Sequence, residues 1–180
     1  MQAARGASLN DRDQALFALV AGLAYVTDVA TKVLAVEVLE GRPPVDVLAG
    51  FFSLDLTRNP GAAFSTATGY TPVLTAVAAV AAVVVVIIAR RLGSTGWAVG
   101  LGLLLGGVLG NLTDRLLRSP GPFRGHVVDF FSFERFPVFN VADICINLAA
   151  AMIIIQAVRG VRVDGEPHRG EKGATGAGRT

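Results

Sequence analysis

The chain has 180 residues, of which 52% are hydrophobic and only 17% are charged, and its formal net charge is +2. This composition, with a mean hydropathy of +0.55, excludes a disordered chain and does not fit an ordinary soluble domain. The basic residues are scattered over termini and loops, so no basic face with interleaved aromatic residues predicts nucleic-acid binding.

Four apolar segments are long enough to cross a bilayer, which requires roughly 20 residues, or fewer where flanking residues reach the interface. They are Ala15 to Val36, Val73 to Ala89, Trp97 to Leu112 and Val141 to Val158. Charged residues interrupt the first segment, so we interpret it as a permanent span and not as a cleavable signal sequence. The predicted fold class is therefore a membrane all-α protein, a bundle of four transmembrane helices.

The segments between and outside the spans predict the topology. Residues 1–14 form an N-terminal segment, residues 15–160 the membrane domain with outward loops 37–72 and 113–140, and residues 161–180 a disordered tail rich in glycine and charge. Within the first outward loop, Phe51 to Leu56 alternates weakly and predicts a short strand at the interface. Nine basic residues lie on the side of the termini and six in the outward loops, so the positive-inside rule places both termini in the cytoplasm.

Charged residues occur at membrane depth, where each costs about 2.5 to 3.5 kcal/mol on insertion scales. Asp28 and Lys32 are four residues apart on the first span and share a helix face, as a self-neutralising pair would. At the outer end of the third span, Asn111, Asp114 and Arg115 also share a face. An Asp114 and Arg115 pair there is explained equally well as a surface ion pair.

Two further carboxylates flank the start of the fourth span. Asp129 lies among apolar residues just before it, and Asp143 lies one turn into it, with Asn140 on the same face. The thirteen residues between the two aspartates are enough for the loop to fold back and bring the carboxyl groups together. Two adjacent carboxylates share one proton, so one can activate water while the other protonates the substrate. The sequence thus predicts an aspartic dyad, in which either residue can hold the proton.

Other hydrolytic chemistries find little support in the sequence. Ser53 and Ser65 lack any motif that would pair them with Lys32. Cys145, the single cysteine, lies on a different helix face from Asp143 without a histidine to activate it, so it is interpreted as a small buried apolar residue. The two histidines do not form a His-Glu-x-x-His motif, and we expect no metal and no cofactor.

Five motifs in order resemble the lipoprotein signal peptidases, also called signal peptidase II, a bacterial family of intramembrane aspartic proteases. Together they extend over about 115 residues. They are Asp28 with Lys32, Asn59-Pro60-Gly61-Ala62-Ala63-Phe64, Gly110-Asn111-Leu112-Thr113-Asp114-Arg115, Val127-Val128-Asp129-Phe130 and Phe139-Asn140-Val141-Ala142-Asp143.

The resemblance implies cleavage of prolipoproteins immediately before a diacylglyceryl-modified cysteine, with Asp129 and Asp143 as the catalytic pair. It implies substrate-binding or supporting roles for Asp28, Lys32, Asn59, Gly61, Asn111, Asp114, Arg115 and Asn140. It also implies a small extracytoplasmic β-sheet cradle beside the four helices, a site at the outer face of the bacterial cell membrane, and no cofactor. Prolipoproteins, membrane lipids and cyclic peptide inhibitors are the partners expected from it.

Two other function classes remain as alternatives. A small proton- or ion-coupled transporter would use Asp28, Asp114, Asp129 and Asp143 as a relay. A relay should string carboxylates along the membrane depth, whereas the last three are expected at one outer boundary, which favours a site open to one side. A noncatalytic scaffold leaves the paired carboxylates unexplained. Arg115 and Arg118 are in addition candidates for lipid-phosphate contacts at that boundary.

Overall fold

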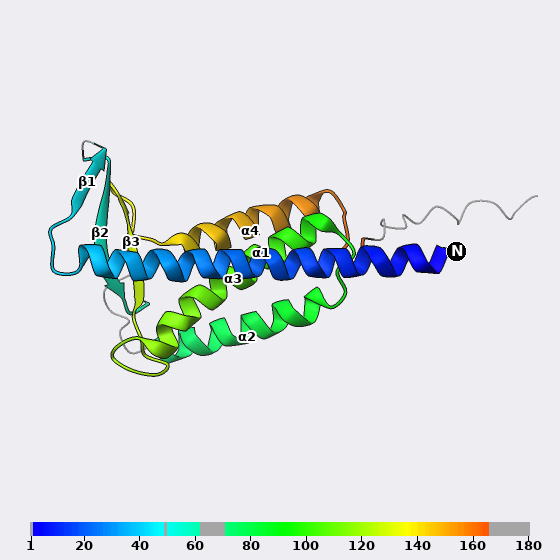
Figure 1. The fold of residues 1–180 in the computed structure, drawn as a ribbon, viewed down its shortest axis with the longest axis horizontal. Coiled ribbons are helices and arrows are strands. Elements are labelled where there is room, and N and C mark those ends of the chain that lie inside the picture. The colour runs from blue at the N-terminus through cyan, green and yellow to red at the C-terminus, as the bar shows by residue number, and fades with distance from the viewer. Residues whose placement is uncertain (1, 49, 62–70, 166–180) are drawn as a thin grey trace, which may run out of the picture.

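The structure, a computed structural model, describes residues 2–48, 50–61 and 71–165, with side chains from residue 11 onward. Its helices are α1 (Gln2–Leu39), α2 (Thr71–Ala89), α3 (Thr95–Leu117) and α4 (Val141–Val158), and its strands are β1 (Val45–Leu48), β2 (Phe52–Asn59) and β3 (Val127–Phe133). The three strands lie together at one end of the helices, and the N-terminus lies at the opposite end (Figure 1).

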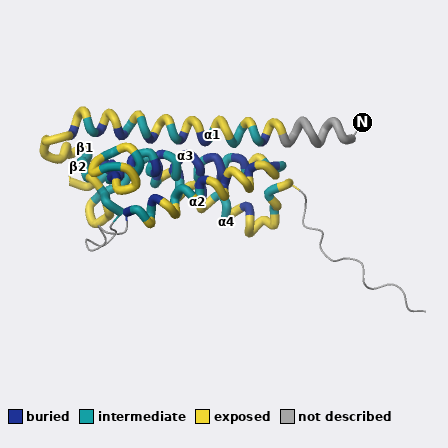
Figure 2. Tube along the Cα trace, turned by 90° about the horizontal axis from the view of Figure 1, so that it is seen from below, coloured by how far each residue is buried: buried dark blue, intermediate teal, exposed yellow. Residues whose placement is uncertain are grey.

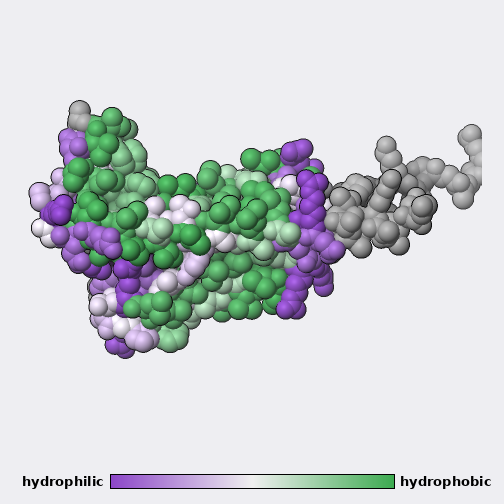
Figure 3. Space-filling view, viewed as in Figure 1, coloured by the Kyte–Doolittle hydropathy of each residue, from purple (hydrophilic) through white to green (hydrophobic). Residues whose placement is uncertain are grey.

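Each predicted span corresponds to a helix that is long and apolar enough to cross a membrane. The fourth has the predicted bounds, the second begins two residues earlier at Thr71, and the third runs from Thr95 to Leu117, longer at both ends than predicted. The first qualifies from Asp11 to Leu39 within a helix that begins at Gln2. Apolar side chains form a belt between two polar ends (Figure 3), which is the pattern of a membrane protein.

Helix α3 is the centre of the bundle and packs against each of the other three helices. In its most apolar window 56% of the residues are buried, compared with 28%, 22% and 17% for α1, α2 and α4. Helix α1 runs along one side of the other helices with exposed residues on its outer face (Figure 2). Glycines permit the close packing: a Cβ at Gly106 would lie 2.6 Å from the Cβ of Ala24, and one at Gly107 only 2.7 Å from the carbonyl oxygen of Ala142.

The strands form an antiparallel sheet in the order β1-β2-β3. The predicted strand Phe51 to Leu56 overlaps the first part of β2, which begins one residue later at Phe52 and continues to Asn59. The register pairs Thr57 with Asp129, so the aspartate that we expected in a loop lies in the middle of β3. Val128 and Phe130 on β3 pack with the buried residues Ala35 and Leu39 of α1, and this apolar cluster fixes the sheet against the end of the bundle.

The segment that follows α4 differs from the predicted disordered tail in its first five residues. The indole Nε1 of Trp97 donates a hydrogen bond of 2.8 Å to the carbonyl oxygen of Val161, and the amide of Gly93 donates one of 2.9 Å to that of Val163. These bonds hold residues 161–165 against the start of α3. The rest of the predicted tail, residues 166–180, lies outside the described residues.

Candidate active site

Asp129 is held by β2, the neighbouring strand in the sheet. Its side chain is 2% exposed, and its Oδ2 accepts a hydrogen bond of 3.0 Å from Nδ2 of Asn59. The Oδ1 of Asn59 accepts in turn from the amide of Gly61 at 2.8 Å. Because the Asn59 oxygen is occupied by this turn, its amino group is the end that faces Asp129.

Asn140 connects the two aspartates. As the N-cap of α4 it forms a capping box with Asp143: its Oδ1 accepts from the amide of Asp143 at 3.0 Å, and its own amide donates to Oδ2 of Asp143 at 3.2 Å. Its Nδ2 donates to Oδ1 of Asp129 at 2.6 Å. One fully buried asparagine is therefore bonded to a carboxylate on β3 and to a carboxylate on α4.

Asn111 on α3 supports the second aspartate. Its Nδ2 donates to Oδ1 of Asp143 at 3.0 Å, while its Oδ1 accepts from Nζ of Lys32 at 2.8 Å and from Nδ2 of Asn140 at 3.1 Å. An ammonium group can only donate, so Lys32 fixes which end of the Asn111 amide faces Asp143. The charge on α1 thereby orients a donor on α3.

Lys32 forms more contacts than the predicted pair with Asp28. Its ammonium group is fully buried and lies 2.8 Å from Oδ2 of Asp28 and 3.1 Å from Oδ2 of Asp114. Asp28 also accepts from the amide of Ala142 at 2.8 Å, and Asp114 from the amide of Val128 at 3.1 Å. Each carboxylate is thus bonded to the backbone next to one dyad residue, which ties α1 and α3 to the start of α4 and to β3.

Arg115 does not pair with Asp114, contrary to one of the two interpretations of that motif. Asp114 pairs instead with the Nε of Arg118. Residues four apart in a helix lie on the same face, whereas adjacent residues such as Asp114 and Arg115 do not. Nη1 of Arg115 is buried without a hydrogen-bond partner among the described residues. Its charge interacts with those of Asp129 and Asp143, so Arg115 is an unpaired donor on the dyad side of α3.

Gly61 fits the turn that follows β2, where both the backbone conformation and the contact with Leu74 exclude a larger residue. The φ angle of Gly61 is +99°, a conformation that residues with a Cβ rarely adopt. A Cβ at this position would also run into Leu74 and would lie 3.6 Å from Nη1 of Arg115. The other residues of that motif, 62–64, lie outside the described residues.

The electrostatics of the site make Asp129 easier to protonate than an ordinary aspartate. Burial raises the pKa of Asp129 from 3.8 to about 6, with a further increase from the charge of Asp143, while the hydrogen bonds from Asn59 and Asn140 oppose the rise. A carboxyl group with such a pKa can act as an acid beside an ionised partner. Among the described residues, no group of three or more histidine, cysteine, aspartate and glutamate side chains is placed to hold a metal ion.

Two buried threonines at the start of α2, which were not predicted as functional residues, bond to the backbone of the neighbouring loops. Thr71 is 2% exposed, and its hydroxyl donates to the carbonyl oxygen of Pro60 at 2.5 Å. Thr75 is fully buried and donates to the carbonyl oxygens of Thr71 at 2.8 Å and of Phe123 at 3.0 Å. The sequence contained a signal that could have identified them, because Thr71 and Thr75 are polar residues four apart in an otherwise apolar segment.

Comparisons with known proteins agree with one another. The family described as Signal peptidase (SPase) II matches residues 20–159. A lipoprotein signal peptidase of Mycolicibacterium smegmatis (strain ATCC 700084 / mc(2)155) is 48% identical over 165 residues, 91% of this chain and 70% of the relative. One of Rhodococcus jostii (strain RHA1) is 49% identical over 150 residues, 83% and 76% of the two chains. A solved structure described as a bacterial membrane enzyme has a TM-score of 0.69 at 26% identity, with 78% of this chain and 91% of that chain covered.

Proposed function

The chain belongs to the signal peptidase II family, and from this premise we propose that it cleaves the signal peptide of diacylglyceryl-modified prolipoproteins immediately before the lipidated cysteine. Family membership supports the removal of signal peptides from lipoproteins by a membrane protease. It also displaces the transporter and scaffold interpretations, since the match extends over most of the chain.

The chemistry that we propose uses Asp129 and Asp143 with one shared proton. The ionised carboxylate takes a proton from water, whose oxygen attacks the scissile carbonyl carbon, while the protonated carboxyl donates to the carbonyl oxygen. The tetrahedral intermediate then breaks its carbon–nitrogen bond as the nitrogen receives the proton of the dyad and a hydroxyl of the intermediate gives its proton to the ionised carboxylate, so the pair again holds one proton. The raised pKa of Asp129, about 6, supports it as a group that can hold this proton.

The hydrogen bonds divide the supporting residues into two proposed roles. Asn59, Asn111 and Asn140 are each bonded to a dyad carboxylate, so they hold the pair in position. Arg115 has an unpaired buried nitrogen, and we assign it to a backbone carbonyl of the substrate. Asp28, Lys32 and Asp114 form a buried charge network that contacts Asn111 and the backbone beside the dyad.

The position of the site suits a lipid-anchored substrate. The dyad lies where the sheet meets the ends of the helices, at one boundary of the apolar belt (Figures 1 and 3). A precursor held in the bilayer by acyl chains and an apolar signal helix exposes its scissile bond at that depth. With both termini in the cytoplasm, as the positive-inside rule predicts, this boundary is the extracytoplasmic one.

One observation carries this proposal: buried Asn140 is hydrogen-bonded to both Asp129 and Asp143. The test is cleavage of a diacylglyceryl-modified precursor by the full chain in liposomes, followed by mass spectrometry of the released peptide. We expect Asp129→Asn and Asp143→Asn each to lower the rate by at least about a thousandfold, since neither variant can share a proton.

Asp55→Asn on β2 is the matched control, because Asp55 lies in the same sheet and is hydrogen-bonded to none of the site residues. It should retain the wild-type rate within about twofold. Near-normal cleavage by either dyad variant overturns the dyad, and equal cleavage of the unlipidated precursor overturns the proposed substrate class.

A further inference from the structure

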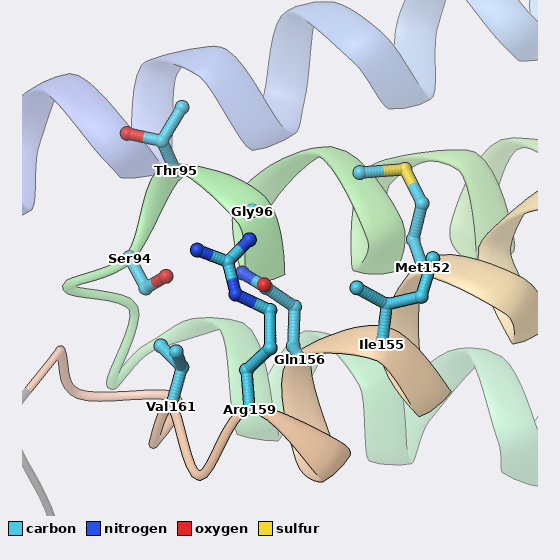
Figure 4. Close-up of a pocket in the computed structure, with 8 residues that line it drawn as sticks. All are labelled: Ser94, Thr95, Gly96, Met152, Ile155, Gln156, Arg159 and Val161. Atoms are coloured by element: carbon cyan, nitrogen blue, oxygen red, sulfur yellow. The ribbon is translucent and has the colours of Figure 1, made fainter.

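A pocket with both polar and apolar lining residues lies at the other end of the bundle, between the start of α3 and the end of α4 (Figure 4). Its volume is about 460 Å³. Because β3 and the start of α4 lie at the sheet end, this pocket is remote from the proposed dyad (Figure 1). None of the residues that line it has a role in the proposed peptidase reaction.

The first turn of α3 presents free backbone donors to this pocket. The N-cap Ser94 has an extended backbone, and its side chain forms no capping hydrogen bond. The first bond inside the helix runs from the amide of Ala98 to the carbonyl oxygen of Ser94. The amides of Gly96 and Trp97 consequently have no acceptor among the described residues, and the positive end of the helix dipole adds to their field.

Gln156 is a second and independent indication of a ligand. Its side chain is only 9% exposed, yet it has no hydrogen-bond partner among the residues that the structure describes. It reaches into the pocket beneath the first turn of α3 (Figure 4), so close that a Cβ at Gly96 would overlap its Nε2. The carboxamide lines the pocket beside the free backbone amides, so its amino group is available to an acceptor bound there.

Arg159 gives the pocket a full positive charge. Its side chain extends from the end of α4 toward the first turn of α3 (Figure 4), and it forms no ion pair within the described part of the chain. Asp13 lies at this helix end, and its Oδ1 accepts from the hydroxyl of Thr95 at 3.0 Å. Thr95 points toward α1 and away from Gln156 (Figure 4).

We propose that this pocket binds the phosphate of an anionic phospholipid from the leaflet on the side of the termini. Free amides at a helix N-terminus, a carboxamide donor and a guanidinium are together the groups that recognise phosphate. The membrane is the source because the lining continues into Met152 and Ile155, and Ile155 is 53% exposed on an apolar span. A lipid with its phosphate at the end of α3 would lay its chains along this surface.

The test uses the full chain purified in a neutral detergent, with lipid retention measured by native mass spectrometry and thermal unfolding measured in parallel. Three probes separate the parts of the proposed ligand: phosphatidylglycerol, diacylglycerol without the phosphate, and inorganic phosphate without the chains. We expect phosphatidylglycerol alone to be retained and to raise the unfolding temperature. An equal shift with inorganic phosphate overturns the lipid assignment, and an equal shift with diacylglycerol overturns the phosphate contact.

Arg159→Gln should weaken phosphatidylglycerol retention about tenfold, the factor expected for the loss of one charge-assisted hydrogen bond. The matched control is Arg90→Gln, which removes an exposed arginine at the same end but outside the pocket and should change retention by less than about twofold. Equal losses in the two variants mean unspecific attraction of a basic surface to anionic lipid, and the site is then rejected.

Gln156→Glu keeps the test valid if removal of the arginine disturbs folding. The change preserves the shape of the side chain and places a carboxylate at the helix N-terminus, where negative charge is favourable. The variant should therefore be at least as stable as the wild type without lipid, and should lose the lipid-induced rise in unfolding temperature. A wild-type rise in this variant overturns the proposal.

Discussion

Lys32 is the residue that links the most parts of the site. Its ammonium group contacts Asp28, Asp114 and Asn111 while it is fully buried. Burial of a charge is tolerated only where partners replace water, and here two carboxylates and an amide oxygen do so. The pair with Asp28 follows from the spacing of the two residues, but the contacts with α3 depend on how the helices pack.

Replacement of Lys32 by methionine should destabilise the protein by about 3 to 5 kcal/mol, because two buried carboxylates lose their common cation. Thermal unfolding in detergent measures the effect. Arg135→Met is the control: that side chain is 90% exposed, and its change should cost less than about 0.5 kcal/mol. A Lys32 variant as stable as this control contradicts the role of the buried network.

The raised pKa of Asp129 predicts how stability depends on pH. Between the ordinary value of 3.8 and about 6 the folded state holds a proton that the unfolded state releases, so the free energy of unfolding falls as pH rises through this range. Above about pH 6 both states are ionised, and the destabilisation is complete.

Asp129→Asn should remove this part of the pH dependence, so that the difference in stability between the two proteins changes by on the order of 1 to 3 kcal/mol between pH 4 and pH 7. Unfolding curves of both proteins at pH 4, 5, 6 and 7 provide the comparison, since all other carboxylates contribute equally to both. Parallel curves for the two proteins rule out a proton held by Asp129 in the folded state.

At the scale of elements, the glycines of α3 determine how close the other helices come. Gly110 faces Asp28 of α1 so closely that a Cβ there would overlap the carboxylate. Gly100 has ordinary space, since a Cβ there would lie 3.5 Å from side-chain atoms of Ile153 and Met152. The two positions are therefore a matched pair on one helix.

Gly110→Ala should lower stability by about 2 kcal/mol or more, because the added methyl group displaces Asp28 from Lys32 and from the amide of Ala142. Gly100→Ala should be neutral or stabilising by up to about 1 kcal/mol through the helix propensity of alanine. Unfolding temperatures of the two variants, measured side by side, distinguish contact with Asp28 from a general effect of helix glycines. Equal shifts would show that Gly110 is not needed for close packing.

At the scale of the whole molecule, the apolar belt separates two polar ends that are built from different structural elements (Figure 3). One end consists of the sheet and the proposed dyad. The other is closed by the segment after α4, whose carbonyl oxygens at Val161 and Val163 accept hydrogen bonds from Trp97 and Gly93. This segment thus belongs to the folded unit, although its composition is that of a tail.

Chains shortened at two positions test this boundary. A chain ended after Gly165 should unfold at the wild-type temperature, whereas one ended after Gly160 should lose about 1 to 3 kcal/mol, because the donors of Trp97 and Gly93 lose their acceptors. Differential scanning fluorimetry in detergent compares the two. Identical stability of both shortened chains would place residues 161–165 outside the folded unit.

The sequence predicts the bundle better than the sheet. Each span is a continuous apolar block, and a bilayer requires such a block to form a helix with its own hydrogen bonds satisfied. β1 has four residues, all exposed, and β3 is recognisable only through its register with β2. Strand pairing is a contact between distant segments, and so the position of Asp129 within a strand was not predictable from its neighbours.

The sequence by itself determined the four spans, the family and the polar residues that gather at one boundary, because apolar length and residue spacing are local properties. Only the tertiary structure decided the partners: Asn140 bonds to both aspartates, Lys32 to Asn111 and Arg118 to Asp114, while Nη1 of Arg115 has no partner in the part of the chain that the structure describes. The reason is physical, since hydrogen bonds and burial depend on groups from separate helices that meet only when the bundle and the sheet pack together.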